Sequence, residues 1–348
     1  MNVMIIKELF YDGRGIARAI IQGNSGVYNT SLDSEHNRGW CSCPHYVFNK
    51  TPCKHIIYLL SKVEYKKMVG KEVDRITTGS SILDELLGGG VPYSIVSGTY
   101  GKPMAGKSMY CYQVGLSNIK NTKKKTLYID TEGIRPQDIK GLLYKFGQRF
   151  GLTTKDIDDR YDITTTLGDI HLKSIQKLFK MFGQNLILEQ SKGGKYTAKF
   201  EYTTPIYKDE DFSGYSMIII DSLSKPLKDT VGTNTANLPT RSQIQERIFG
   251  MLTHVAVQHN IAIIINHHVS SNPVMPFGTD FGHPIGGDSI MYNTKYVLEF
   301  WDATNQIKKD SGFGLEARRV RLFRHPTEQV TGEWKVIRLQ KDVGYVDK

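Results

Sequence analysis

The pattern of hydrophobic and polar residues changes along this chain. Over residues 3–31, short apolar runs are separated by turn residues at Asp12-Gly13 and Asn24-Ser25-Gly26, which predicts three short strands. Further along, the apolar runs LYID, YSMIIID and IAIIIN predict buried strands, and SMYCYQVGLSNI and RSQIQERIFGMLTHVAVQHN are predicted helices. Strands that alternate with helices in this way are typical of an α/β domain.

A change of composition separates two parts of the chain. From Ser61 to Arg75 the sequence is polar and basic, SKVEYKKMVGKEVDR, which predicts the end of a helix followed by a linker. At 348 residues the chain is long enough for two domains, one of them with a full hydrophobic core. We therefore predict a small module at 1–65, a linker at 66–74 and a larger domain at 75–348.

The most informative stretch of the larger domain is GKPMAGKS, residues 101–108, which fits G-x-x-x-x-G-K-S. A strand precedes it and a helix follows it, so backbone N–H groups and a helix N-terminus would point at one anion. In such a loop Lys107 reaches the β- and γ-phosphates, and the Ser108 hydroxyl binds Mg²⁺. The alternative is a chance match in a glycine-rich chain. The predicted nucleotide-binding residues here are Gly101, Lys102, Pro103, Met104, Ala105, Gly106, Lys107, Ser108 and Met109.

A second cluster of residues with metal-binding chemistry lies near the N-terminus. Cys41, Cys43, Cys53 and His55 form the pattern C-x-C-x9-C-x-H. Thiolates and an imidazole are ligands of tetrahedral Zn²⁺, and the second pair begins a helical run, HIIYLLSKV, that would hold it rigidly. Two alternatives are that His45 replaces one ligand, or that two buried structural thiols stand beside a surface pair. The pattern resembles the SWIM zinc finger, a ββα module associated with binding DNA or protein.

Composition and charge narrow the classes of function. The 45 Lys and Arg residues exceed the 35 Asp and Glu residues, which favours a polyanionic partner such as nucleic acid or serves only solubility. No apolar run is long enough to span a membrane, and the N-terminus lacks the features of a signal peptide, so we expect a cytoplasmic protein with no membrane partner. Three of the four cysteines lie within 41–53, which favours a metal site over a disulfide framework.

Several motifs of the larger domain occur in the order found in one family. ITTGSSILDELLGGG at 76–90 runs into the phosphate loop, DTEG at 130–133 is followed by Arg135-Pro136, and IIDS ends at Ser222. Over roughly residues 75–348 the chain resembles the RecA/RadA group of strand-exchange ATPases, especially its archaeal and eukaryotic branch. The resemblance implies an α/β fold: a RecA-like P-loop ATPase core with a mainly parallel, twisted sheet flanked by helices. The small ββα zinc module replaces the family's usual N-terminal helical DNA-binding domain.

The same resemblance implies the roles of the central site residues. Glu132 occupies the position of the general base that orients the attacking water, and Lys107 stabilises charge on the phosphates. Asp221, at the end of the strand YSMIIID, would hold Mg²⁺ through water, together with Ser108. The implied cofactors are ATP and Mg²⁺, with Zn²⁺ in the N-terminal module.

The resemblance also implies two DNA-binding loops and a phosphate sensor. After Asn266, His267 stands where the family has a glutamine that senses the γ-phosphate; the alternative is a polar pair at a strand end with no sensing role. Residues 225–240 and 270–284 correspond to the two DNA-binding loops, which we expect to be flexible. The predicted DNA-binding residues are Lys228, Arg241, Phe277, Phe281, Gly286 and Gly287.

Two segments outside these motifs carry further predictions. LILEQ and KYTAKFEY flank Lys192-Gly193-Gly194, which predicts a hairpin inserted at 185–214, where the family usually has only a helix. Its lysines would meet a polyanion or only solvent. Near the C-terminus, TKYVLEFW and ARRVRLFRHPTEQVTGEWKVIRLQKDVGYV predict closing antiparallel strands.

These observations favour a DNA-dependent ATPase that binds single-stranded DNA and acts in homologous recombination and repair, by ATP-dependent assembly on DNA and strand exchange. Double-stranded DNA is a second expected ligand. We expect a homo-oligomer, either a filament or a ring, with ATP at subunit interfaces, and a zinc module that contacts DNA or a recombinase or repair protein. Two alternatives stay open: a non-filamentous paralogue or mediator that uses ATP as a switch, and a KaiC-like regulatory ATPase that acts through protein partners.

Overall fold

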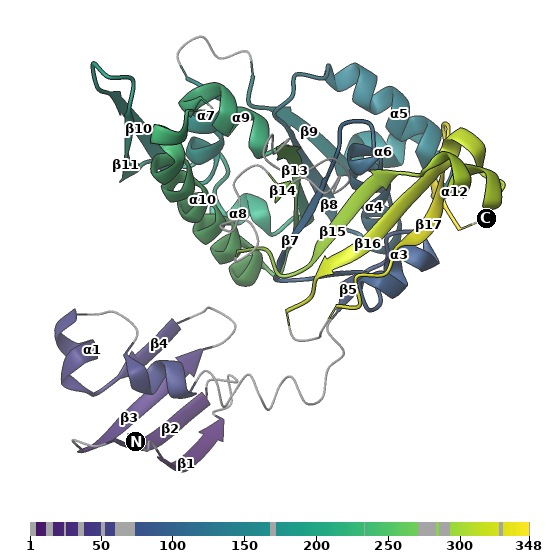
Figure 1. The fold of residues 1–348 in the computed structure, drawn as a ribbon. Coiled ribbons are helices and arrows are strands. Elements are labelled where there is room, and N and C mark those ends of the chain that lie inside the picture. The colour runs from purple at the N-terminus through teal and green to yellow at the C-terminus, as the bar shows by residue number, and fades with distance from the viewer. Residues whose placement is uncertain are drawn as a thin grey trace. The chain divides into compact units, whose positions relative to one another are not determined.

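The computed structural model describes residues 5–11, 17–23, 26–33, 38–49, 53–59, 74–167, 172–232, 234–270, 283–284, 293–326 and 330–347. The chain divides into two compact units, Met1–Asp74 and Arg75–Lys348 (Figure 1). The boundaries 1–65, 66–74 and 75–348 stay a prediction, because all of the predicted linker except Asp74 lies outside the described residues.

The N-terminal unit is built on a four-stranded antiparallel sheet in the order β1-β2-β3-β4. Side chains alternate along each strand, and one row packs with the following helices, bringing Ile21 and Leu32 together with Ile56 and Leu59. The expected ββα order is found in β3, β4 and the helical segments, and β1 and β2 extend the sheet. The elements are β1 (Ile5–Tyr11), β2 (Ala17–Gly23), β3 (Gly26–Asp33), β4 (Arg38–Cys41), α1 (Pro44–Asn49) and a helical segment at 54–59.

The larger unit is organised around one sheet with the strand order β18-β17-β16-β15-β7-β13-β12-β8-β9, and β14 pairs with β13. The strand pairs from β15 to β9 are parallel, whereas those from β15 to β18 are antiparallel. The strands are β7 (Val96–Gly101), β8 (Lys125–Asp130), β9 (Tyr161–Thr165), β12 (Tyr215–Asp221), β13 (Ala262–Ser270), β14 (His283–Pro284), β15 (Val297–Asp302), β16 (Ala317–Arg324), β17 (Lys335–Gln340) and β18 (Gly344–Val346). A small separate pair is formed by β5 (Arg75–Ile76) and β6 (Val91–Pro92).

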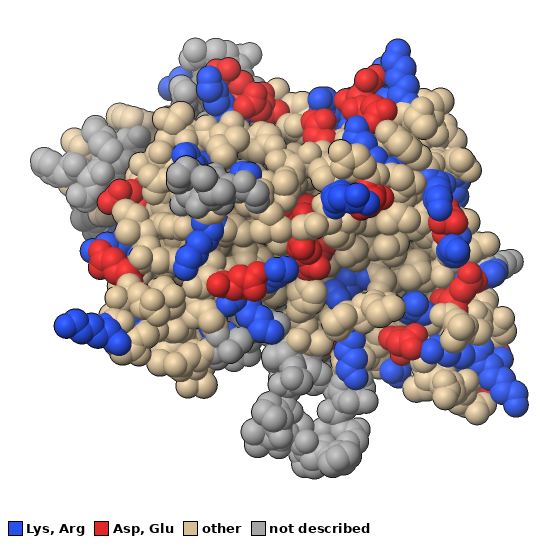
Figure 2. All heavy atoms as spheres, turned by 90° about the horizontal axis from the view of Figure 1, so that it is seen from above, with Lys and Arg blue, Asp and Glu red and all other residues tan. Residues whose placement is uncertain are grey.

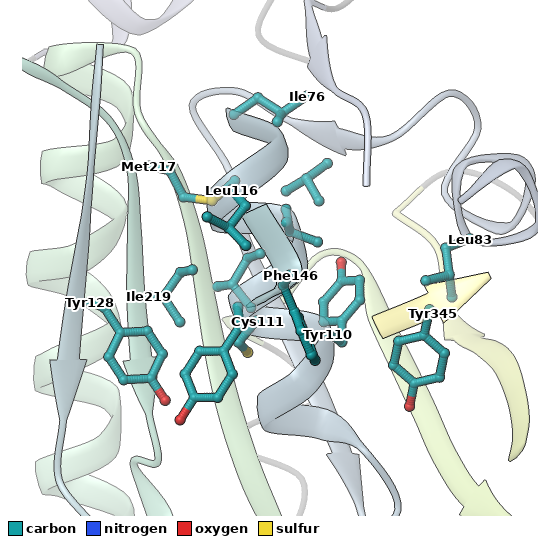
Figure 3. Packing of buried hydrophobic residues seen from close by; sticks show 14 of the residues in the cluster. Ile76, Leu83, Tyr110, Cys111, Leu116, Tyr128, Phe146, Met217, Ile219 and Tyr345 are labelled. Atoms are coloured by element: carbon teal, nitrogen blue, oxygen red, sulfur yellow. The ribbon is translucent and has the colours of Figure 1, made fainter. Parts of the chain in front are cut away.

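Helices cover both faces of this sheet (Figure 1). Helices α4, α5 and α6 pack on one face, and α7, α9 and α10 pack on the other. Figure 3 shows the first face, where Tyr110, Phe146 and Tyr345 lie in one aromatic cluster. The helices are α3 (Ser81–Leu86), α4 (Lys107–Asn121), α5 (Pro136–Arg149), α6 (Thr154–Arg160), α7 (Ser174–Met181), α8 (Asp209–Phe212), α9 (Ser224–Val231), α10 (Leu238–His259) and α12 (Asn305–Asp310), with 3-10 turns η1 (Thr235–Asn237) and η2 (Gly314–Glu316).

The inserted hairpin predicted around residues 192–194 is present. Strands β10 (Gln184–Gln190) and β11 (Tyr196–Tyr202) pair in an antiparallel register that joins Leu186 to Phe200. Leu186 is buried in the same cluster as α7, so the base of the hairpin is part of the core. The exposed lysines near its tip extend into solvent.

Two predicted loop regions are more regular than expected. Residues 225–240, apart from the undescribed residue 233, contain α9, η1 and the start of α10. Pro226 and Pro239 lie in the first turns of α9 and α10, where proline is tolerated because those N–H groups have no partner within the helix. Of the predicted loop 270–284, Ser270 pairs with His283 across β13 and β14, and residues 271–282 lie outside the described part of the chain.

The C-terminal strands only partly follow the prediction. Strands β16, β17 and β18 form an antiparallel end of the sheet. Strand β15, predicted to belong to that antiparallel group, is antiparallel to β16 but parallel to β7, so it joins the two parts of the sheet. The reason is that β15 pairs with β7, the strand that precedes the phosphate loop. The local sequence pattern, which predicted antiparallel hairpins, does not reveal this distant partner.

On the face shown in Figure 2, Lys and Arg side chains are mixed with Asp and Glu side chains. Basic side chains on that face therefore have acidic side chains among them, so the positive charge is spread out. None of the helices within the described residues has the length and apolar character needed to cross a membrane.

Candidate nucleotide site and metal centre

The loop GKPMAGKS connects β7 to α4 and folds around its own lysine. The ammonium group of Lys107 donates hydrogen bonds to the carbonyl oxygens of Gly101 and Lys102, each at 2.9 Å. Gly101 leaves no room for a side chain, because a Cβ atom there would lie 2.0 Å from the carbonyl oxygen of Phe300. Gly106 precedes α4 with a φ of 98°, in the left-handed region that favours glycine. The loop thus holds a cation at a helix N-terminus, the arrangement that binds phosphate.

Lys107 shares its environment with both predicted carboxylates. It is 5% exposed, and burial lowers the pKa of its ammonium group. The charges of Asp221 and Glu132 partly oppose that effect. The structure therefore brings together the three charged side chains predicted to handle ATP.

Asp221 ends β12 at the carboxyl edge of the sheet, where parallel α/β sheets bind ligands. Its Oδ2 accepts a hydrogen bond from Tyr128 at 2.7 Å, and its Oδ1 accepts one from the Asn266 amide at 2.6 Å. Burial raises the pKa of the Asp221 carboxyl, and hydrogen bonds that include one from Ser108 oppose the shift. A buried carboxylate beside a hydroxyl is a pair of hard oxygen donors that fits Mg²⁺.

Glu132 lies just beyond β8 and is held by two partners. Its Oε1 accepts a hydrogen bond from the Ser222 hydroxyl at 2.8 Å and lies 2.5 Å from Nε2 of His268. The hydrogen bond to His268 lowers the pKa of the Glu132 carboxyl, although burial acts in the opposite direction. The carboxyl therefore stays ionised at neutral pH, as a general base requires.

A buried aspartate fixes the turn that presents Glu132. The carboxylate of Asp130 accepts hydrogen bonds from the backbone N–H groups of Glu132 and Gly133, at 3.2 and 2.9 Å. The next residue, Thr131, joins this turn to the neighbouring strand, since the backbone N–H of Ser222 donates to its hydroxyl at 2.8 Å. The general-base position is thus built from two adjacent strand ends.

The two histidines at the end of β13 point to opposite faces of the sheet. His268 contacts Glu132, whereas His267 packs against Phe249 of α10, with ring centroids 6.2 Å apart. His267 is 1% exposed, and neither of its ring nitrogens has a hydrogen-bond partner within the described residues. Side chains alternate along a strand, which places the two rings on opposite faces. The sensor role of His267 stays a prediction, and His268 is the histidine that contacts Glu132.

The four predicted zinc ligands converge in the N-terminal unit. The ligand atoms of Cys41, Cys43, Cys53 and His55 all lie within 4.8 Å of one another, and all four residues are buried. Nδ1 of His55 lies 3.8 Å from the Sγ atoms of both Cys41 and Cys53. Usual zinc–sulfur and zinc–nitrogen bonds in a tetrahedron would place such atoms about 3.6 Å apart. The donor set and its spacing therefore fit zinc.

Further contacts around Cys41 are typical of a metal-bound thiolate. Its Sγ accepts hydrogen bonds from the Thr30 hydroxyl at 3.4 Å and from the backbone N–H of Cys43 at 3.5 Å. Burial raises the pKa of the Cys41 thiol to about 12, an effect that a bound cation would reverse. His45, the alternative ligand, is exposed and lies outside the cluster.

Comparison with known protein families gives two matches, one in each unit. Residues 69–193 match the Rad51 family model, and residues 29–64 match that of the SWIM zinc finger. Both matches support a chain of the RecA/RadA type with an N-terminal SWIM zinc finger. The SWIM match covers β4, the first helix, the four cluster residues and most of β3.

Curated relatives of the RecA/RadA type have low sequence identity to this chain. A meiotic recombination protein DMC1 homolog of Glycine max is 27% identical over 239 residues, covering 66% of this chain and 59% of that protein. The DNA repair and recombination protein RadA of Metallosphaera sedula is 27% identical over 255 residues, covering 71% of this chain and 66% of RadA. RadB of Methanococcoides burtonii is 23% identical and is covered to 89%. The chain thus spans less than two thirds of the first of these relatives.

The fold also matches a solved RecA/RadA-type structure. A crystal structure of the RadB recombinase superposes with a TM-score of 0.54 at 21% identity, covering 78% of this chain and 99% of that chain. This supports the predicted RecA-like fold, with its mostly parallel sheet.

The residues predicted to contact DNA are only partly described. Lys228 is exposed on α9. Arg241 is partly buried in α10, where its guanidinium donates to the carbonyl oxygen of Asn234 at 3.4 Å. Four further predicted DNA-binding residues lie outside the described part of the chain: Phe277, Phe281, Gly286 and Gly287.

Sequence reasoning missed several side chains that support the RecA/RadA-type site. His268 was detectable, because counting alternate positions back from it along IAIIINHH places it on the same face as Asn266. Ser222 directly follows the predicted Asp221, but only the structure shows that it bonds Glu132. The role of Tyr128 could not be predicted from the local sequence, because a tyrosine within the apolar run LYID is expected simply to be a core residue of a buried strand.

Proposed function

We propose that this chain is a DNA-dependent ATPase of the RecA/RadA type that acts in homologous recombination and repair. The observation that carries the proposal is the convergence of Lys107, Glu132 and Asp221 at the carboxyl edge of the sheet. The similarity to RadA and to the DMC1 homolog supports the choice of DNA as the partner. Single-stranded DNA is the expected ligand. Double-stranded DNA is a second expected ligand, which would donate the other strand in strand exchange.

Each residue has a distinct part in the proposed reaction. Oε1 of Glu132 is held by Ser222 and His268, and Oε2 would accept a proton from the water that attacks the γ-phosphorus. Lys107 would leave its loop carbonyls and stabilise the charge that grows on the phosphate oxygens. Ser108 and Asp221 would hold Mg²⁺, which supplies further positive charge to the β- and γ-phosphates when bound.

His268 is our candidate for coupling ATP to DNA. It contacts the proposed general base, and it lies two residues before Ser270, where the predicted second DNA loop begins. A movement of that segment on DNA would therefore reach Glu132 through one side chain. We propose that this contact replaces the glutamine-based sensor of the family.

The N-terminal module is proposed to bind one Zn²⁺ through Cys41, Cys43, Cys53 and His55. The metal would cross-link β4 to the helical segment at 54–59 and so supply much of the stability of a small unit. We propose that this module contacts DNA or a repair protein, and that subunits assemble with ATP at their interfaces.

Replacing Glu132 by glutamine tests the assignment. The substitution Glu132→Gln keeps the size of the side chain and one hydrogen-bond acceptor, but the amide cannot take a proton. The kcat for ATP hydrolysis should therefore decrease at least about 100-fold. Affinity for Mg-ATP, measured by calorimetry, should stay within about twofold. Glu201→Gln on the exposed hairpin is the matched control and should hydrolyse ATP as the wild type does. Undiminished hydrolysis by Glu132→Gln would falsify the role of this residue.

One observation favours a second candidate, a non-filamentous paralogue that uses ATP as a switch. His267 occupies the position of the family's glutamine and the neighbouring His268 contacts Glu132, which favours a coupling of ATP to DNA unlike that of the family. Electron microscopy with single-stranded DNA and ATP separates the two candidates, because only the first predicts regular filaments.

A further inference from the structure

The C-terminal strand β18 carries a tyrosine that reaches the back of the phosphate loop. The hydroxyl of Tyr345 donates a hydrogen bond to the carbonyl oxygen of Ala105 at 3.1 Å, and both residues are buried. The ring packs against Phe300, with centroids 5.7 Å apart. Figure 3 shows Tyr345 in the same group of side chains as Tyr110 and Phe146. A residue three positions before Lys348 thus touches the middle of the loop GKPMAGKS.

This contact fixes the orientation of a backbone group that would bind phosphate. The carbonyl of Ala105 and the N–H of Gly106 belong to one planar peptide unit, and in a trans peptide they point in opposite directions. Because Tyr345 holds the carbonyl towards the core, the N–H of Gly106 is directed away from the core. In a phosphate-binding loop, the backbone N–H groups that point towards the centre of the loop, and not towards the protein core, surround the bound anion.

The fit between the loop and the C-terminal strand is close. A Cβ atom at Gly106 would lie 2.1 Å from the hydroxyl of Tyr345 and 2.9 Å from a methyl carbon of Leu339. Gly106 therefore serves two needs, a positive φ and the absence of a side chain on the Tyr345 side. Any side chain at position 106 would therefore collide with Tyr345 and Leu339.

Tyr345 is itself held in place by contacts that do not involve the loop. Its backbone N–H donates to Oε1 of Gln113 on α4 at 2.6 Å, and its carbonyl oxygen accepts a hydrogen bond from Arg149 on α5. Two residues later, Asp347 accepts a hydrogen bond from the backbone N–H of Ser81 at 2.8 Å. The hydroxyl is thus presented to the loop from a fixed position.

We propose that Tyr345 is a positioning residue for nucleotide binding, acting through the Ala105–Gly106 peptide to aim the Gly106 N–H at a phosphate. The inference rests on the proposed ATP site. Tyr345 does not contact the nucleotide, and its effect is on the geometry of the empty loop before ATP arrives. The loop would otherwise have to adopt this geometry during binding, at a cost in affinity.

The substitution Tyr345→Phe removes only the hydroxyl. We expect calorimetry on the full-length protein to give an Mg-ATP affinity roughly fivefold weaker than that of the wild type, as for the loss of one buried neutral hydrogen bond. KM for ATP should rise by a similar factor, while kcat at saturating ATP stays within about twofold. A hydroxyl with a merely structural role would lower the melting temperature without this division between KM and kcat.

Tyr161→Phe is the matched control. Tyr161 is buried in the same cluster, and its hydroxyl has no hydrogen-bond partner within the described residues, so its removal should leave ATP affinity unchanged. Equal affinity of Tyr345→Phe and the wild type overturns the proposal. Absence of ATP binding by the wild type would instead overturn the proposed function, and the positioning role with it.

Hydrogen exchange gives a second test that needs no nucleotide. In the ATP-free protein, a peptide covering residues 101–106 should exchange its amide hydrogens faster in Tyr345→Phe than in the wild type, while α4 beyond its first turn exchanges at the same rate. Unchanged exchange in residues 101–106 contradicts the positioning role even if ATP binding is intact. Both variants are compared well below their melting temperatures, so partial unfolding does not enter the result.

Discussion

At the level of single residues, the nucleotide site depends on side chains that hold one another. Asp221 is fixed by Tyr128 and Asn266, and Glu132 is fixed by Ser222 and His268. Such supporting contacts reduce the number of geometries that each carboxylate can adopt, which is a precondition for positioning water and metal. Substitutions at the supporting positions should therefore affect catalysis through Asp221 or Glu132.

His267 should make the protein less stable as the pH decreases. Burial lowers its pKa from 6.5 to about 3, so between these values the unfolded chain binds a proton that the folded chain does not. The contribution of neutral His267 to the free energy of unfolding is fully present above pH 6.5, the pKa of histidine in the unfolded chain. It is lost progressively as the pH falls from 6.5 towards 3. From about pH 7.5 to pH 5.5 this residue should account for about 1.4 kcal/mol of lost unfolding free energy.

Urea unfolding of the wild type and of His267→Phe at the two pH values measures this contribution. The phenylalanine ring has a similar shape and does not titrate, so the pH-dependent loss should be smaller in the variant by that amount. The same pH dependence in both proteins would mean that His267 is not buried in its neutral form.

Single residues also show where sequence reasoning ends. Lys107, Ser108, Glu132 and Asp221 belong to local motifs at fixed spacing, so their convergence in one site could be predicted. The support from Tyr128 could not, because it depends on the adjacency of β8 and β12, which lie about ninety residues apart in sequence. Alternation along the strand places His268 on the same face as Asn266, but only the structure shows its contact with Glu132.

At the level of elements, the inserted hairpin is joined to the segment that precedes α10. The backbone N–H of Tyr196 donates to the Asn237 side chain at 2.9 Å, and the Thr240 hydroxyl donates to the Tyr196 carbonyl oxygen at 2.6 Å. Residues 237 and 240 lie in the segment 225–240 that was predicted to be the first DNA-binding loop. The hairpin thus supports η1 and the first turn of α10 from one side.

The hairpin should contribute to the stability of the ATPase unit. Leu186 is 3% exposed, so Leu186→Ala should lower the unfolding free energy by about 3 kcal/mol. Tyr202, which pairs with Gln184 at the same end of the hairpin, is 87% exposed, and Tyr202→Ala should cost less than about 0.5 kcal/mol. Denaturant unfolding of both variants checks this, and an equally small effect of Leu186→Ala would show that the hairpin is only a solvated appendage.

The hairpin strands, the phosphate-loop helix and the buried central strands could be predicted, because each has a strong local pattern. The parallel pairing of β15 with β7 could not, since parallel partners are set by packing over long sequence distances. Helix α9 was missed because the polar segment 225–240 is bounded by Pro226 and Pro239, which suggested a loop, whereas the first turn of a helix tolerates proline.

At the level of the whole molecule, the chain combines a unit that contains the candidate zinc ligands with a unit that contains the candidate nucleotide site. The four cysteine and histidine ligands lie within Met1–Asp74, and the nucleotide site lies within Arg75–Lys348. Each site is built entirely from its own unit. Loss of metal should therefore affect the first unit and leave nucleotide binding intact.

Metal analysis tests this separation. Protein purified without chelator should contain one zinc per chain, and Cys41→Ser should reduce the content to near zero while Mg-ATP affinity stays unchanged. The fourth cysteine, Cys111, is buried in α4 outside the cluster, so Cys111→Ala should keep its zinc. Wild-type protein without zinc, or zinc loss in Cys111→Ala, would contradict the assignment.

The most direct test of the central claim is the rate of ATP hydrolysis with and without single-stranded DNA, at low and at moderate salt. We predict strong stimulation by DNA that weakens as salt increases, because phosphate contacts are screened and counterions compete for them. Stimulation would mean that the contact of His268 with Glu132 still couples the two ligands. A hydrolysis rate that DNA does not change at either salt concentration would contradict the account, even if ATP binds.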